Sequence, residues 1–173
     1  ITHRKDAIFQ TALTGLPTTD NHVLKMIPME ASCYAFLKQR FPGVNKVHFH
    51  GAGGVGLLAV VSIKQHTKYE ARNMLATMIS AQGTKLVIAV DEDVDVFDMD
   101  KVMWAVCTRS QADKDLIVLP RTAAFQLDPS VPEVGVTTTM GIDATKPYGE
   151  EFEEVTTIPG AEKLPDILKL WKK

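Results

Sequence analysis

The sequence predicts an α/β fold in which a mixed β-sheet is flanked by helices. Short apolar runs rich in β-branched residues, the clearest of which is Leu86–Val90, have the length of strands buried on both faces. Longer stretches place apolar residues at the spacing of one helix face. The two patterns alternate along the chain, and this order is typical of helices packed on a sheet.

The chain's bulk properties favour one ordinary globular unit. Its 173 residues are enough for one buried core, so we expect a single α/β domain over residues 1–173. The formal net charge of -2 does not indicate nucleic acid as a partner. No apolar run approaches the roughly 20 residues that span a bilayer, and we expect no signal peptide. Cys33 and Cys107 both lie in predicted helices, so we expect buried thiols in a cytoplasmic protein.

The first residues suggest that more chain precedes them. The sequence opens at Ile1 without a methionine and is already strand-like there. We therefore expect a piece of a longer polypeptide.

The first half of the chain predicts a helix and then two strands. A helical stretch runs from about residue 22 to residue 41, and Pro28 should divide it by starting a second helix. Residues 44–50 and 57–64 are expected strands, joined by a glycine-rich loop. The apolar stripe of the second helix is Met29, Cys33, Phe36, Leu37 and Phe41.

The second half continues the alternation and then loses it. We predict a helix over 68–82, the central strand 86–90, a helix over 98–109 and a short strand over 116–119. Residues 120–160 are rich in Pro, Thr, Gly and acids, so we expect an irregular segment, followed by a terminal helix over 161–173. The buried face of the 68–82 helix should be Ala71, Met74, Leu75, Met78 and Ile79.

The glycine-rich loop matches the G-x-G-x-x-G pattern of dinucleotide sites over Gly51–Gly56. Such a site needs its glycines to open a helix whose amides face the pyrophosphate. Here the glycines lead into the apolar run 57–63, which resembles a strand. A flexible strand-to-strand connection is the favoured interpretation, and a nucleotide-binding module remains an alternative.

Two further patterns in the sequence could indicate metal sites. His48 and His50 share one strand face, but two ligands do not close a site, so ordinary polar roles are favoured. The acidic run after the central strand begins at Asp91 with the alternating acids of a calcium-binding loop. However, Val96 and Val102 stand where that loop needs glycine and glutamate. We therefore predict no metal site in this chain.

Local roles explain several charged residues near the central strand. Asp98 or Asp100 can cap the helix that follows, and solvation of the sheet edge explains most of the other acids. Arg109 at the end of that helix can satisfy the last carbonyls and the helix dipole. No serine, cysteine or histidine stands in a recognisable nucleophile arrangement. Chemistry alone therefore predicts only an α/β domain.

Several stretches, taken in order, resemble the C-terminal domain of the UbiD family of prenylated-FMN-dependent (de)carboxylases. Gly15 and His22 add to the match. The matching stretches are Thr2–Ile8 (THRKDAI), Asp91–Asp95 (DEDVD), Val102–Arg109 (VMWAVCTR) and Met140–Pro147 (MGIDATKP).

The resemblance implies a two-domain enzyme that reversibly decarboxylates aromatic or α,β-unsaturated carboxylic acids. In that family the N-terminal flavin-binding domain holds prenylated FMN, a divalent metal (Mn or Mg), K⁺ and the catalytic carboxylate network, so no catalytic residue is expected in this chain. The chain would close over the flavin as a lid, supply part of the substrate pocket and contribute to homo-oligomer contacts in a dimer or hexamer. It should be inactive alone.

The family's positions near substrate and cofactor carry over onto a few residues. The pocket-lining apolar pair falls on Phe125 and Leu127, and the loop-to-helix position near the reacting carboxylate falls on Leu24 and Lys25. Lys25 stands where cinnamate-type members have an apolar residue, which favours a hydroxybenzoate-type substrate. The cofactor-proximal positions are Thr14, where some members have cysteine, Ala81 and Gln82, with Met78 where some members have lysine.

Two alternatives to this function remain open from the sequence. The chain could be a nucleotide-binding module that uses Gly51–Gly56. It could also be a purely assembly domain, associating through the irregular segment and the terminal helix.

Overall fold

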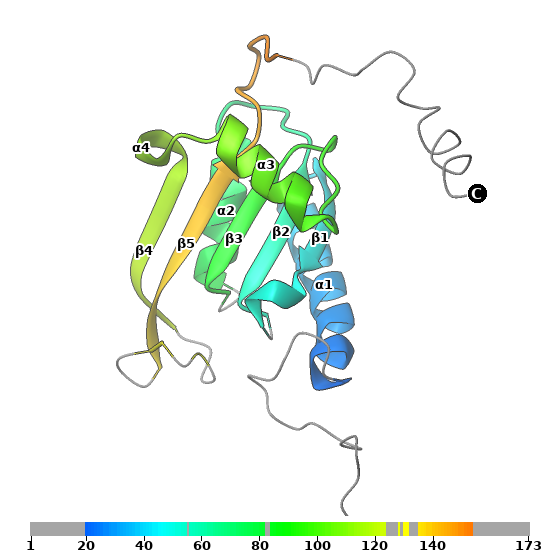
Figure 1. Ribbon diagram of the computed structural model, residues 1–173, viewed down its shortest axis with the longest axis vertical. Coiled ribbons are helices and arrows are strands. Elements are labelled where there is room, and N and C mark those ends of the chain that lie inside the picture. The colour runs from blue at the N-terminus through cyan, green and yellow to red at the C-terminus, as the bar shows by residue number, and fades with distance from the viewer. Residues whose placement is uncertain are drawn as a thin grey trace, which may run out of the picture.

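A five-stranded mixed sheet forms the centre of the protein, with helices on both faces (Figure 1). The computed structural model describes residues 20–54, 56–81, 84–123, 128, 130–131 and 135–153. The spatial order of the strands is β1-β2-β3-β5-β4, in which β2, β3 and β5 are parallel and the edge strands β1 and β4 are antiparallel to their neighbours. The strands are β1 (Val44–Phe49), β2 (Leu58–Ile63), β3 (Leu86–Val90), β4 (Leu116–Ala123) and β5 (Val136–Ala144).

The helices divide between the two faces of the sheet. α1 (Asp20–Arg40) and α2 (Glu70–Ala81) share one apolar core with the sheet, and α3 (Met99–Arg109) packs into a second core on the opposite face. Figure 1 shows α2 and α3 on opposite sides of β3. The short elements η1 (Gly51–Gly53) and α4 (Ala112–Asp115) lie in connections. The predicted mixed sheet flanked by helices is therefore confirmed.

The central strand and the helix before it follow the sequence prediction closely. β3 covers the predicted residues 86–90, and four of its five side chains are buried. The five residues predicted to form the buried face of α2 are all buried. These five side chains are 0–1% exposed and pack against the sheet. They do so because apolar residues at helical spacing form a continuous stripe on one face of the helix.

α1 differs from its prediction, because it is one continuous helix through Pro28. Proline removes a hydrogen bond to the residue four positions earlier, which is Leu24. Leu24 and Pro28 both face solvent, where a freed carbonyl can bond to water. Phe36, predicted in the buried stripe, is also exposed, whereas Cys33 and Leu37 are buried.

The predicted irregular segment 120–160 is wrong over two parts of its length. β4 extends to Ala123, and residues 136–144 form β5, which lies between β3 and β4. The residues of β5 that face α2 are Thr137, Thr139 and Gly141, and none of them carries a large apolar side chain. A Cβ at Gly141 would lie 3.3 Å from the Cβ of Leu75, so α2 packs directly on the strand backbone. On this face β5 lacks the apolar side chains expected of a buried strand, whereas Ile142 and Ala144 on its other face pack into the core with α3.

The two cysteines are free thiols in different surroundings. Cys33 is buried as predicted, and burial raises the pKa of its thiol to about 11. Cys107 is exposed on α3, so its predicted burial is wrong. In the part of the chain that the structure describes, no helix has the length and apolarity needed to cross a membrane. The predicted terminal helix 161–173 lies outside the described residues.

Candidate functional site

Arg109 and two aspartates form an ion-pair cluster at the carboxyl edge of the sheet, the edge at which β2, β3 and β5 end. The Arg109 Nη1 donates to Asp91 Oδ2 at 2.7 Å and to Asp93 Oδ1 at 2.9 Å, and its Nη2 donates to Asp93 Oδ2 at 3.0 Å. The predicted role of Arg109, satisfying the last carbonyls of its own helix, is therefore wrong. Its guanidinium instead turns back to the loop that follows β3.

Burial and pairing act differently on the two carboxylates. The Arg109 side chain is only 3% exposed, and that of Asp93 is 44% exposed. Hydrogen bonds from Arg109 lower the pKa of Asp93 to about 2. Burial raises the pKa of Asp91 above its ordinary value, although Lys146 and Arg109 act in the opposite direction. Asp93 therefore has the bidentate contact with Arg109, and Asp91 has the shorter and more buried one.

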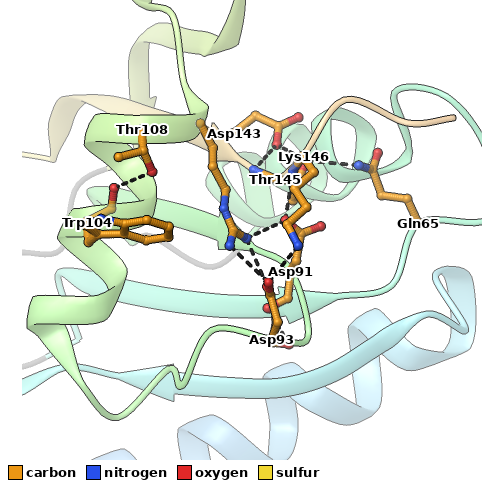
Figure 2. A network of polar contacts seen from close by, with 10 residues as sticks. Gln65, Asp91, Asp93, Trp104, Thr108, Asp143, Thr145 and Lys146 are labelled. Atoms are coloured by element: carbon orange, nitrogen blue, oxygen red, sulfur yellow. Dashed lines mark hydrogen bonds and ion pairs between the residues drawn. The ribbon is translucent and has the colours of Figure 1, made fainter. Parts of the chain in front are cut away.

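The end of β5 extends this cluster across the sheet. The Lys146 backbone N–H donates to Asp91 at 2.8 Å, and its Nζ donates to Asp93 at 2.8 Å. The Thr145 hydroxyl donates to Asp143 at 2.6 Å and accepts from Gln65 at 2.9 Å. Figure 2 shows these polar side chains converging from the ends of three neighbouring strands. The network therefore ties β2, β3 and β5 together at their carboxyl ends.

The chemistry of this cluster is that of a structural cross-link. Both oxygens of Asp93 accept hydrogen bonds from cations, so its carboxylate is poorly suited to take a proton from a substrate. Trp104 and Phe152 cover the guanidinium, with its Cζ 5.5 and 5.9 Å from their ring centroids. Two open clefts of about 320 and 410 Å³ lie beside the cluster. The buried Arg109 Nε lacks a hydrogen-bond partner among the described residues.

Asp98 caps α3 as the sequence suggested. Its carboxylate accepts from the backbone N–H groups of Asp100 and Lys101, at 3.1 and 3.3 Å. This confirms a capping role for one of the loop acids. Solvation does not explain Asp91 or Asp93, because both are paired with Arg109.

The histidine pair of β1 has structural partners. His48 Nδ1 lies 2.7 Å from Glu30 Oε1, which also accepts from the Phe49 N–H at 2.9 Å. His50 Nδ1 accepts from the Ala52 N–H at 3.1 Å and so caps η1. Within the described ranges, no three His, Cys, Asp or Glu side chains are grouped so that they could hold a metal ion.

The glycine-rich loop joins two antiparallel strands. It contains the three-residue η1, and the chain then passes through Gly54 and Gly56, both with positive φ, into β2. Gly53 packs against Leu58, whose Cβ would lie 2.1 Å from an added Cβ. No α-helix begins at these glycines, so the nucleotide alternative lacks the helix N-terminus that it requires.

The opposite, amino edge of the sheet gathers the described residues for which the resemblance implied a pocket. Ala81 is the last residue of α2, which runs from the end of β2 to the start of β3. The first half of α1 lies at the same edge, because a Cβ at Gly56 would lie 3.0 Å from Met29 Cε. Leu24 and Lys25 in that half are exposed. β4 also ends at this edge, as Figure 1 shows.

The other five predicted positions are either outside the described residues or buried in the core. Thr14, Gln82, Phe125 and Leu127 lie outside the described residues. Met78, at the position where some family members have a lysine near the cofactor, is fully buried in the core between α2 and the sheet. Leu24, Lys25 and Ala81 share one edge, and no contact among the three is described.

Comparison with known proteins agrees with the fold and places it in a family. Residues 22–144 match the family model described as the 3-octaprenyl-4-hydroxybenzoate carboxy-lyase C-terminal domain. The structure is similar to the UbiD-class enzyme HmfF from Pelotomaculum thermopropionicum, solved in complex with FMN. That similarity has a TM-score of 0.76 and 38% identity, over 84% of this chain and 34% of the solved one.

Curated relatives show the same partial coverage. The anhydromevalonate phosphate decarboxylase of Methanothermobacter thermautotrophicus is 33% identical over 88% of this chain and 36% of its own length. The phenolic acid decarboxylase of Sedimentibacter hydroxybenzoicus is 34% identical over 87% of this chain and 32% of its own length. The chain thus spans about a third of the relatives that it matches, and it belongs to the UbiD family, in the region of the family's C-terminal domain.

Proposed function

We propose that this chain is the C-terminal lid and oligomerisation domain of a prenylated-FMN-dependent decarboxylase that acts reversibly on aromatic or α,β-unsaturated carboxylic acids. The family membership supports the reaction class. The observation that supports the domain's role is that the first half of α1, with Leu24 and Lys25, and the end of α2 at Ala81 lie at the same edge of the sheet, the amino edge. The chain leaves β4 at this edge for the segment that contains Phe125 and Leu127.

The described residues do not fit a cofactor site of their own. They hold no group of three metal-ligating side chains, and the glycine-rich loop leads into a strand. We therefore assign prenylated FMN, its divalent Mn or Mg ion and K⁺ to the protein's own N-terminal flavin-binding domain. When bound there, the cofactor would stabilise the charge left by the departing carbon dioxide.

In this proposal the chain shapes the substrate pocket and excludes water from it. Leu24 is 72% exposed at the amino edge and offers apolar surface to a neighbouring domain. Closing an apolar surface over the reacting atoms expels water and protects a carbanion-like intermediate. Lys25, next in the chain and also exposed, would give this surface a cation that can bind a ring hydroxyl or a carboxylate. This supports a hydroxybenzoate-type substrate.

The relatives are named for two kinds of substrate, so the substrate of this protein must be tested directly. Gallate and phenolic acid decarboxylases and anhydromevalonate phosphate decarboxylases all match this chain at 33–42% identity. The full-length protein, reconstituted with prenylated FMN, should release carbon dioxide from 3,4-dihydroxybenzoate or gallate. Lys25→Leu should shift its preference toward cinnamate. Release from none of these acids would refute the proposed reaction.

An assembly role is the second part of the proposal. α3 exposes Met103 and Trp104 on its outer face, 45% and 41% exposed, beside the exposed Cys107. Large apolar side chains gathered on one helix face often mark a protein interface. Light scattering of the full-length protein should show a dimer or hexamer, and Met103→Lys should weaken that assembly.

A further inference from the structure

α1 carries apolar side chains on its outer face as well as on the face that packs on the sheet. The inner face holds Met26, Cys33 and Leu37, all at most 5% exposed, in the core that α1 shares with α2. Leu24 and Ile27 lie outside that core and are 72% and 66% exposed. A helix that only covers a sheet has a polar outer face, so this second apolar face indicates a second partner.

The exposed apolar side chains form a continuous stripe, which we call the outer stripe of α1. Its members are spaced by three or four residues, the spacing at which the side chains of a helix lie one above the other. They extend over about 17 Å of helix, at about 1.5 Å per residue. All of them are exposed, and they are Leu24, Ile27, Ala31, Tyr34 and Ala35.

The outer stripe has polar borders. Lys25, Ser32 and Gln39 lie along one side of it and are exposed. At its far end, Lys38 Nζ donates to the Val44 carbonyl at 2.7 Å and so leaves the apolar surface for the turn after the helix. The stripe is therefore a bounded apolar surface and not a scatter of single exposed residues.

One polar group lies within the outer stripe. Pro28 has no N–H, so the Leu24 carbonyl loses the helix hydrogen bond that it would otherwise accept. This freed acceptor is at the first turn of the stripe, beside Lys25. A surface that covers the stripe should therefore be mainly apolar and should bring a hydrogen-bond donor to this end.

The place of α1 in the family indicates what covers the stripe. The match to the model of the family's C-terminal domain begins at residue 22, in the first turn of α1. The matched region is about a third of the relatives' length, so most of each relative lies outside it. α1 is thus the first element of this domain after its junction with the rest of such a protein.

The opposite face of the sheet has a different proposed partner. α3 covers that face, and its exposed Met103 and Trp104 carry the proposed contact between copies. Leu24, at the start of the outer stripe, is by contrast the residue that the proposed function places against a neighbouring domain. We propose that the outer stripe of α1 is the surface on which this domain is seated against its own flavin-binding domain. This inference rests on the proposed function, which supplies the two-domain architecture.

The composition of the stripe suits a contact inside one polypeptide. Interfaces between the domains of one chain resemble transient interfaces in size, and the covalent link keeps them occupied. Ala31 and Ala35 have small side chains, so another element can approach the backbone of α1 closely. Leu24 and Ile27 then supply the larger apolar contacts, nearest to the proposed pocket.

Cysteine labelling of the full-length protein tests whether the stripe is covered. Positions 31 and 32 are adjacent on α1 and both are exposed within this domain, but only position 31 belongs to the stripe. A small maleimide should modify Ala31→Cys at least about tenfold more slowly than the control Ser32→Cys, because the covering domain blocks the reagent. Ala35→Cys should behave like Ala31→Cys. Each rate is read by mass spectrometry of the peptide and divided by the rate in urea, and equal normalised rates would overturn the inference.

Cross-linking identifies what covers the stripe. Tyr34→p-benzoylphenylalanine replaces one aromatic residue of the stripe by a photoreactive one, in full-length protein assembled from isotopically light and heavy chains. The inference requires cross-links within one isotopic form that join position 34 to the flavin-binding domain. Cross-links that join the two forms, or that stay within residues 1–173, would overturn it. If no cross-link forms, the labelling ratio decides.

Neither measurement depends on turnover. A full-length protein that releases no carbon dioxide from the acids named above would refute the proposed reaction. The labelling and cross-linking results would still report whether the outer stripe of α1 is covered, and by which domain.

Discussion

Arg109, the last residue of α3, donates hydrogen bonds to Asp93 from both terminal nitrogens of its guanidinium, at 2.9 and 3.0 Å. The same Nη1 reaches Asp91 at 2.7 Å, so one buried cation holds both acids of the loop that leaves β3. This loop is the strongest functional candidate by its place at the carboxyl ends of parallel strands. The pairing makes it a structural joint between strand and helix instead.

Replacing Arg109 by Met should destabilise the domain strongly. The change leaves Asp91 and Asp93 without their main counter-charge. Because both carboxylates keep some solvent and their hydrogen bonds from Lys146, the cost in the free energy of unfolding should be about 2 kcal/mol. Urea unfolding of the full-length protein measures this. Lys101→Met, which removes an exposed pair, should cost less than about 1 kcal/mol. Equal effects of the two substitutions would contradict the assigned role of Arg109.

Asp93 should make stability depend on pH in the acid range. Its pKa is lowered from 3.8 to about 2 in the folded protein, so its contribution is fully present above about pH 4 and is lost as pH falls toward 2. Because this side chain is 44% exposed, solvent screening limits the contribution to roughly 1 kcal/mol.

The pH effect is measured as the difference in urea midpoint between wild type and Asp93→Asn from pH 5 to pH 2. Subtracting the variant is needed because burial raises the pKa of Asp91 and of Asp143, which act in the opposite direction. The difference should shrink as pH falls. A difference that grows toward pH 2 would contradict the account.

Gly141 should not accept a larger side chain. Its Cα faces α2, and even a single added carbon meets Leu75 Cβ at 3.3 Å, so Gly141→Val should destabilise by about 1–3 kcal/mol through overpacking. Thr138→Val, on the exposed side of the same strand, is the control and should change thermal stability little. If Gly141→Val were as stable as wild type, α2 could not lie directly on β5.

The sequence predicted the helices and strands whose buried residues are apolar and regularly spaced. α2 and β3 belong to this class, because their buried positions are apolar and regularly spaced. β5 does not, since Thr137, Thr139 and Gly141 form its face toward α2, and the apolar alternation of Met140, Ile142 and Ala144 on its other face covers only part of the strand.

Local sequence patterns also could not predict the two ion-pair contacts, for a related reason. Arg109 and Asp93 are 16 residues apart, and they meet only because α3 returns along the sheet face to the loop where it began. Lys85 Nζ donates to Asp128 Oδ2 at 2.8 Å, although the two are separated by 43 residues and by two strands. Neither spacing matches a helix or strand period, so the only available signal was the acid-rich loop itself. The resemblance supplied the family, which composition and periodicity could not.

Phe125 is the predicted pocket residue whose replacement should change catalysis most directly. Phe125→Ala in the full-length holoenzyme should alter turnover or the preference among substituted benzoates, because it removes apolar surface from the proposed lid. Steady-state kinetics on 3,4-dihydroxybenzoate, gallate and cinnamate measure the change. Unaltered kinetics on every accepted acid would count against the placement of Phe125 in the pocket.

The central claim is that this chain shapes a decarboxylase pocket without carrying the catalytic groups. Carbon dioxide release from 3,4-dihydroxybenzoate, gallate and cinnamate, measured side by side for the full-length holoenzyme and for residues 1–173 supplied with prenylated FMN, tests it most directly. The account predicts release by the full-length protein and none by residues 1–173. Release by residues 1–173 alone would contradict it.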